Sequence, residues 1–264
     1  MRVVYVHGAG RQENRHLLKR RLDGHLFGSN QLDRTILAYF SDILHVESDL
    51  PDDLEATTGP VGAVIERAFE QRALEVAAAQ PWAHLDDDGA GEEELPDPAF
   101  LVLARIVSRD VTEYLVGGGA EAMRGPVRDA IRSAGSPAVV IAHSLGTIVT
   151  YDVLSDLGPD APEIPLLLTL GSPLGLSNVL ERLVGGTPPP PGVPVTVQRW
   201  DNIADRFDPV ALVQRLSPLF DPLGTIHDSN VNNEALLSHD LTGYLDTAAV
   251  QSLVRDALGI AVPS

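Results

Sequence analysis

One short segment constrains the fold of this chain more than any other. Residues 138–142 form an apolar run that is rich in β-branched residues and lacks polar alternation, which predicts a strand buried in a parallel sheet. The run stops before Ser144, and apolar residues with helical spacing begin at Leu145. A strand followed at once by a helix requires a sharp turn at Ser144. Such a turn needs small residues two positions before and after it, and Ala142 and Gly146 meet this requirement.

The predicted turn gives Ser144 two alternative roles. It would lift the hydroxyl clear of the sheet and place the amide of Leu145 at a helix N-terminus, where it can stabilise an oxyanion. Ser144 is therefore a candidate nucleophile. Serine is also a common N-cap before an apolar helix, and the turn alone leaves both roles open.

The length and the order of predicted elements favour one α/β domain over residues 1–264. Strands alternate with helices, about six of each, which predicts a mostly parallel sheet covered by helices on both faces. The predicted strands cover residues 2–7, 35–40, 138–142, 164–170, 193–200 and a short stretch within 225–233. The predicted helices cover residues 12–26, 98–116, 121–134 and 241–258, with further helices beginning at Pro60 and Leu145.

Residues 42–116 interrupt the alternation of strands and helices before the Ser144 strand. We expect a helical insertion here. The helix beginning at Pro60 has an apolar face that includes Val61, Ile65 and Phe69. This face predicts either packing against the sheet or a cap over a substrate pocket.

Charge and cysteine content limit the partners and the compartment. The chain has 37 acidic and 19 Lys or Arg residues, and its net charge of −18 repels nucleic acid and anionic lipid surfaces. The absence of cysteine excludes disulfides and a cysteine nucleophile, and it fits a reducing compartment. No run approaches the roughly 18 apolar residues that span a bilayer, and the N-terminal residues resemble a strand rather than a signal peptide. We expect a cytoplasmic protein without stable membrane association.

A glycine-containing loop, His7-Gly8-Ala9-Gly10, follows the first predicted strand and precedes a helix. A dinucleotide-binding fingerprint would need glycine at position 13, where the chain has Glu13, so this interpretation is disfavoured. Two interpretations remain. The loop is either a plain turn between strand and helix or an oxyanion loop, in which Gly8 lets the backbone approach a substrate and the Ala9 amide donates to it.

These motifs occur in a defined order along the chain. HGAG follows the first strand, AHSLG ends the central strand, GSP follows the next strand, DPV lies at 208–210, and a histidine precedes the last helix. The set resembles the α/β hydrolase superfamily, specifically its lipase- and esterase-like members. The motifs are spread over nearly the whole chain but cover a small fraction of it, and residues 42–116 are not covered. Ala142 stands where that family usually has glycine.

The resemblance implies an α/β-hydrolase fold and a serine hydrolase that cleaves esters through an acyl-enzyme. It implies Ser144 as nucleophile, Asp208 as acid, His239 as base, and the amides of Ala9 and Leu145 as oxyanion donors. The implied partner is a small-molecule acyl ester, with no cofactor and no metal; oligomeric state is not predicted. The same residues would serve a peptidase, a thioesterase or an acyltransferase. A non-catalytic binding module with this fold is the alternative from another class. Because the chain begins at the HG strand, we also expect a compact six-stranded form without the antiparallel strands that open larger members.

The acid has rivals in the same segment. Asp201 directly follows an apolar run and is expected to lie within a strand. Asp205 is the alternative acid. Asp208 is preferred because Pro209 follows it at a favoured first helical position, although a simple N-cap explains the same pattern.

The histidines were compared in the same way. His227 is the alternative base, and His239 is preferred because the base of this family lies on a loop before the last helix. We expect His143 to pack at the sheet edge and His7 to hold the glycine loop. A metal site built from His227, Asp228, His239 and Asp240 is disfavoured because nothing places them on one helix face or in one loop.

Overall fold

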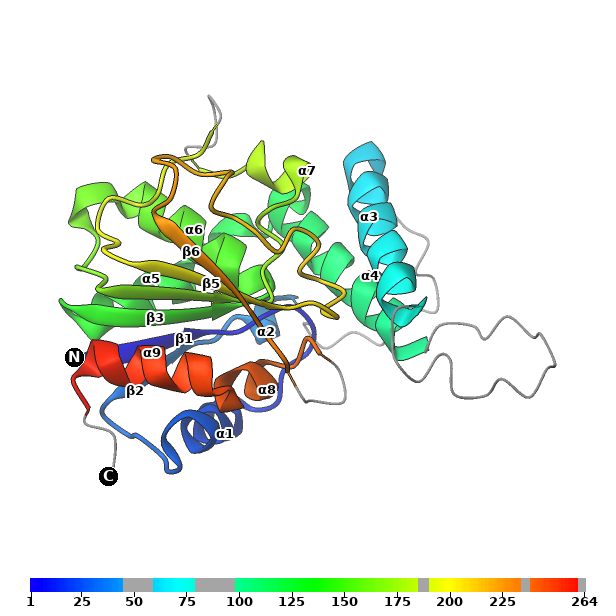
Figure 1. Ribbon diagram of the computed structural model, residues 1–264. Coiled ribbons are helices and arrows are strands. Elements are labelled where there is room, and N and C mark those ends of the chain that lie inside the picture. The colour runs from blue at the N-terminus through cyan, green and yellow to red at the C-terminus, as the bar shows by residue number, and fades with distance from the viewer. Residues whose placement is uncertain (45–58, 79–97, 185–189, 234–237, 261–264) are drawn as a thin grey trace, which may run out of the picture.

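A six-stranded, all-parallel sheet forms the centre of the molecule, with strand order β2-β1-β3-β4-β5-β6 (Figure 1). The computed structural model describes residues 1–44, 59–78, 98–184, 190–233 and 238–260. The predicted α/β class with a parallel sheet is confirmed. The strands are β1 (Arg2–Val6), β2 (Thr35–Ala38), β3 (Ala138–His143), β4 (Leu166–Leu170), β5 (Trp200–Asp205) and β6 (Ile226–Val231).

Helices cover both faces of the sheet. Side chains of successive β1 residues point to opposite faces: Val4 and Val6 pack with α5 and α6, whereas Val3 and Tyr5 pack with α1, α8 and α9. Because both faces are buried, β1 and β3 are apolar along most of their length, which explains the continuous runs in the sequence. The helices are α1 (Arg15–Phe27), α2 (Ser41–Leu44), α3 (Gly59–Ala78), α4 (Pro98–Thr112), α5 (Ala120–Ala134), α6 (Leu145–Leu157), α7 (Ser177–Leu180), α8 (Leu241–Asp246) and α9 (Ala248–Leu258), with a π-helical turn at Glu113–Gly117 and a 3-10 turn at Gly158–Asp160.

The segment 42–116 contributes two long helices beyond the carboxyl ends of the strands (Figure 1). Ile65 and Phe69 of α3 are buried in the same core as Val107 of α4. The predicted apolar face of α3 is therefore used for packing between helices. The side chain of Val61 and the stretches 45–58 and 79–97 lie outside the described residues.

The fifth strand lies further along the chain than predicted. The prediction placed it at 193–200, but β5 begins at Trp200, and Val197 forms an isolated bridge to Ile164 instead of a ladder. Two local features disfavour a strand there. Pro194 has no N–H to donate to a ladder, and Val195 is 74% exposed.

The true β5 is buried although half of its residues are polar, because its polar side chains have partners. Asp201 lies within the strand, as expected, and accepts hydrogen bonds of 2.5 and 3.0 Å from Arg199. Asn202 accepts from Thr169 Oγ1 at 3.0 Å and donates to Asp228 at 2.9 Å. These bonds offset the cost of burying the polar groups.

The single closing helix predicted over 241–258 is divided into α8 and α9. Thr247 between them has an extended backbone, with φ −67° and ψ 137°, and its side chain accepts a hydrogen bond from the Val250 amide as the N-cap of α9. Asp240 caps α8 in the same way through the Thr242 amide, at 2.7 Å. Two capping residues thus start two helices.

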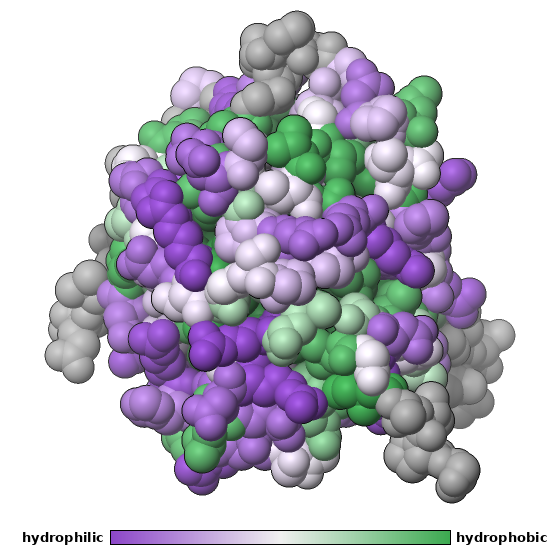
Figure 2. All heavy atoms as spheres, turned by 90° about the vertical axis from the view of Figure 1, so that its left-hand side faces the viewer, coloured by the Kyte–Doolittle hydropathy of each residue, from purple (hydrophilic) through white to green (hydrophobic). Residues whose placement is uncertain are grey.

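Figure 2 shows the end of the molecule at which the chain begins, opposite α3 and α4. Hydrophilic and hydrophobic residues are mixed over this face. Within the described ranges, no helix combines the length and the apolar character that crossing a membrane requires.

Candidate active site

Ser144 occupies a strained turn between β3 and α6. It is the only non-glycine residue with positive φ among the described residues, with φ 54° and ψ −130°. Its amide donates to the Leu170 carbonyl at 3.1 Å, and its carbonyl accepts from the Thr147 amide at 2.9 Å and from the Thr147 hydroxyl at 2.7 Å. Such a backbone costs on the order of 1–3 kcal/mol and occurs mainly where function requires it.

Two glycines let neighbouring segments approach this turn. A side chain at Gly146 would collide with the His7 carbonyl. A Cβ atom at Gly8 would lie 2.6 Å from Ser144 Cβ and 2.9 Å from His143 Nδ1. The loop after β1 therefore lies directly against Ser144, and only glycine fits at position 8.

His239 and Asp208 form a buried pair. His239 Nδ1 lies 2.9 Å from Oδ1 and 2.8 Å from Oδ2 of Asp208. A carboxylate accepts hydrogen bonds, so Nδ1 carries the proton and Nε2 is left with its lone pair. Asp208 also accepts from the Tyr244 hydroxyl at 2.7 Å and from the Val210 amide at 2.7 Å. Burial opposes ionisation of Asp208, but the His239 ring and these donors stabilise its charge, and its pKa lies below the usual value.

Ser144 and His239 line the same cavity, which has a volume of about 180 Å³. Ser144 Oγ and His239 Nε2 are both buried, and neither has a hydrogen-bond partner in the part of the chain that the structure describes. Buried polar atoms without partners are rare and call for an explanation. Bonds between a nucleophile and its base are often long until a substrate is bound, so the two atoms are candidates for one reaction.

The two predicted oxyanion donors belong to segments that meet at Ser144, the start of α6 and the loop after β1. Leu145 is the first residue of α6, where the amides have no acceptor within the helix. Ala9 lines the cavity on the loop after β1. This loop is held from a distant segment, because the Gly10 amide donates at 2.7 Å to the buried carboxylate of Asp110 on α4.

The alternative acid and the alternative base have other surroundings. Asp205 accepts from the amides of Phe207 at 2.7 Å and Asn233 at 2.5 Å, and burial raises its pKa despite these donors. His227 is exposed on β6, the edge strand, and does not line the cavity. Across the described residues, no three His, Cys, Asp or Glu side chains are grouped to hold a metal ion.

His143 does more than pack at the sheet edge. Its Nε2 donates to the backbone carbonyl of His239 at 2.8 Å, and the two rings lie 4.5 Å apart. Burial, together with the nearby His239, lowers the pKa of His143 to about 3. The ring is thus neutral at physiological pH and supports the loop that carries His239. His7 holds the glycine loop, because its Nε2 accepts from the Phe40 amide at 3.0 Å and its Nδ1 donates to the Gly8 carbonyl at 2.8 Å.

The cavity is lined by a different helix of the insertion from the one predicted to cap it, which was the helix beginning at Pro60. Leu103 and Val107 of α4 line it, and no described residue of α3 does.

The sequence did not predict the contacts that three residues make with the site: Asp110 with the glycine loop, Tyr244 with Asp208, and the His143 side chain with the His239 carbonyl. Only Asp110 carried a signal, as an acidic residue beside Val111 on the apolar face of a predicted helix.

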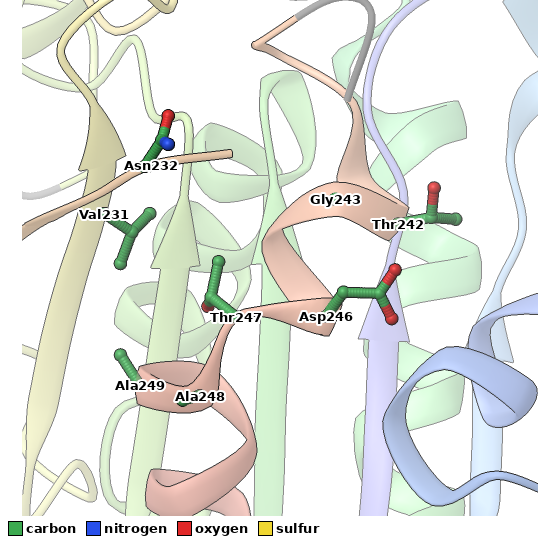
Figure 3. A pocket seen from close by; sticks show the side chains of 8 residues that line it. All are labelled: Val231, Asn232, Thr242, Gly243, Asp246, Thr247, Ala248 and Ala249. Carbon is green, nitrogen blue, oxygen red and sulfur yellow. The ribbon is translucent and has the colours of Figure 1, made fainter. Parts of the chain in front are cut away.

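A larger hollow of about 640 Å³ lies elsewhere, between the end of β6 and the start of α8 and α9 (Figure 3). None of the candidate catalytic residues lines it. The smaller cavity is the better candidate because its lining residues include an oriented imidazole and two buried polar atoms that have no partner in the described part of the chain. The lining residues of the larger hollow are Val231, Asn232, Thr242, Gly243, Asp246, Thr247, Ala248 and Ala249.

Comparison with protein-family models and with curated proteins gives no match for this chain. Function is therefore inferred from the geometry of the site. A serine on a strained turn at a helix start and an imidazole oriented by a buried carboxylate line one cavity. This combination suits acyl transfer.

Proposed function

We propose that this protein is a serine hydrolase with an α/β-hydrolase fold, and that it cleaves carboxylic esters through an acyl-enzyme on Ser144. The main support is the buried His239–Asp208 pair. His239 lines the same cavity as the strained serine, and its buried Nε2 has no hydrogen-bond partner among the described residues. The position of the site also supports the proposal, because ligands of parallel α/β sheets bind beyond the carboxyl ends of the strands.

In the proposed reaction, His239 Nε2 takes the proton of the Ser144 hydroxyl while Oγ attacks the ester carbonyl carbon. The amides of Ala9 and Leu145 stabilise the oxyanion. The oxyanion collapses and the alcohol leaves with the proton from His239. A water molecule then attacks the acyl carbonyl carbon while His239 Nε2 takes its proton. When the second oxyanion collapses, His239 returns this proton to Ser144 Oγ, the bond to Oγ breaks and the carboxylic acid leaves. Asp208 keeps the imidazole in the required tautomer and stabilises its cation.

Labelling with a fluorophosphonate probe tests the proposal directly, because the probe reacts with an activated serine. We expect the wild-type protein to be labelled on Ser144 and Ser144→Ala to be unlabelled, with both proteins folded by circular dichroism. Hydrolysis of p-nitrophenyl butyrate should fall by about a thousandfold or more in the variant. A folded wild-type protein that resists the probe would contradict the proposal and favour a non-catalytic binding module.

A further inference from the structure

We propose that the site accepts esters of short-chain acids and excludes long acyl chains, with Leu103 and Val107 of α4 setting the limit. This inference rests on the proposed ester hydrolysis and specifies the substrate class of the same site.

The cavity is small. Its volume is about 180 Å³, whereas pockets for drug-sized ligands span about 300–1,000 Å³. The cavity is therefore smaller than a usual site for a drug-sized ligand. A butyryl group needs much less of this space than an octanoyl group, whose chain is four carbons longer.

Part of the cavity lining is apolar. Leu22 and Val107 are almost fully buried, and Leu103 is partly buried. These side chains suit an alkyl group rather than a charged or sugar acyl group. Exposed polar residues of the same lining, Arg21 and Asp240, suit a site opening to solvent. The acyl chain would lie against the apolar residues.

The helix α4 is attached to the loop after β1. This attachment matters because an outward movement of α4 would let longer acyl chains enter the cavity. Asp110 of α4, buried and ionisable, accepts the Gly10 amide at 2.7 Å. One turn earlier, Ile106 would lie 3.3 Å from a Cβ at position 10, so the helix also touches the loop. Moving α4 outward would break a hydrogen bond to a buried carboxylate.

Packing against α3 also holds α4 in position. Ile65 and Phe69 of α3 are buried in one core cluster with Ala104 and Val107. An outward shift of Val107 would therefore disturb a packed helix pair. Close-packed cores resist such shifts, so the Val107 wall of the cavity is held in place by the fold.

The test is a chain-length series of p-nitrophenyl esters, from acetate through butyrate and octanoate to palmitate, assayed on the full chain. We expect kcat/KM to be highest for acetate or butyrate and to fall at least about tenfold at octanoate. The variant Leu103→Ala should raise kcat/KM for octanoate relative to butyrate by about tenfold. Val107→Ala provides a second enlargement should Leu103→Ala prove poorly folded.

Val102→Ala is the matched control. Val102 lies on the same helix, is 55% exposed and does not line the cavity. Its chain-length profile should equal that of the wild type.

Two failures can be told apart. A wild-type optimum at octanoate or palmitate, with Ser144 labelled by a fluorophosphonate, would overturn the short-chain inference and leave the hydrolase proposal standing. The inference would also be overturned by enlarged variants that fold and keep the wild-type profile. No labelling and no hydrolysis of any ester would overturn both.

Discussion

The turn after β3 and the loop after β5 end at the same edge of the sheet but treat buried polar groups in opposite ways. Both strands are completely buried. The β3 turn leaves the Ser144 hydroxyl without a partner among the described residues, whereas the β5 loop surrounds Asp205 and Asp208 with amide and hydroxyl donors. Under the proposed function, the Ser144 hydroxyl is the group that reacts, and the hydrogen-bonded carboxylates of the β5 loop hold His239 and the loop in position.

The largest effect is expected where the β5 loop touches the reaction. Asp208→Asn is isosteric and should keep the fold, because its amide oxygen at the Oδ1 position can still accept from the Val210 amide while its NH₂ group at the Oδ2 position can donate to the Tyr244 hydroxyl oxygen. The amide cannot hold the His239 ring with its proton on Nδ1, so ester turnover should fall by about 10³–10⁴-fold. Steady-state kinetics with p-nitrophenyl butyrate measures this loss. A loss under tenfold in a folded variant would remove Asp208 from the proposed reaction.

Asp205→Asn is the matched change three positions earlier. Its carboxylate accepts two amides, and an Asn side chain would turn its NH₂ group toward one of them. We expect the free energy of unfolding to fall by about 1–3 kcal/mol, measured by urea denaturation, with turnover of the folded fraction within a few-fold of wild type. A greater loss of turnover than in Asp208→Asn would exchange the roles of the two carboxylates.

Tyr244→Phe should affect the Asp208 carboxylate and the Asp205 backbone amide at once. The Tyr244 hydroxyl donates to Asp208 at 2.7 Å and accepts the Asp205 amide at 2.8 Å. Its removal leaves a buried amide unpaired and weakens the orientation of His239. We expect a loss of about 1–2 kcal/mol in unfolding free energy and a drop of about tenfold in kcat. Unchanged values of both quantities would show that the bridge is energetically neutral.

The smallest effect concerns His143 beside the serine. Its pKa in the folded protein is lowered from 6.5 to about 3, so below pH 6.5 the unfolded chain binds a proton that the folded protein refuses. Stability from this group is thus complete above pH 6.5 and is lost as the pH falls toward 3. At about pH 5.5 this loss amounts to about 1 kcal/mol.

Replacement of His143 by Gln removes this titration and retains a donor for the His239 carbonyl. Urea denaturation at neutral pH and at about pH 5.5 should show a smaller acid-induced loss in His143→Gln than in the wild type. Parallel losses in the two proteins would mean that the buried ring does not resist protonation.

The same contrast explains which features could be predicted from the sequence. The β3 strand and its turn were predictable because burial on both faces demands an apolar run, and the sharp turn demands small residues next to Ser144. The class of fold followed from repeated runs of this kind. Each of these signals is local, so a single sequence displays it.

The β5 region could not be predicted because its stability comes from remote partners. Asn202 needs Thr169 and Asp228, which lie far away in the sequence. The local pattern favoured residues 193–200 instead. Similarly, Asp110 reaches Gly10 across 100 positions, and no spacing rule connects an acidic residue on a helix to a loop that distant.

The strained backbone at Ser144 has a consequence for how this protein could change. Hydrogen bonds to Leu170 and Thr147 clamp the residue from both sides, so the scaffold imposes the conformation whatever side chain is present. Any non-glycine residue that replaced Ser144 would have the same strained φ, whereas glycine adopts a positive φ at little cost. Homologues that had lost the proposed activity would therefore still have the strained backbone at this position. Glycine at position 144 in such homologues would indicate that the strain had been relieved after the activity was lost.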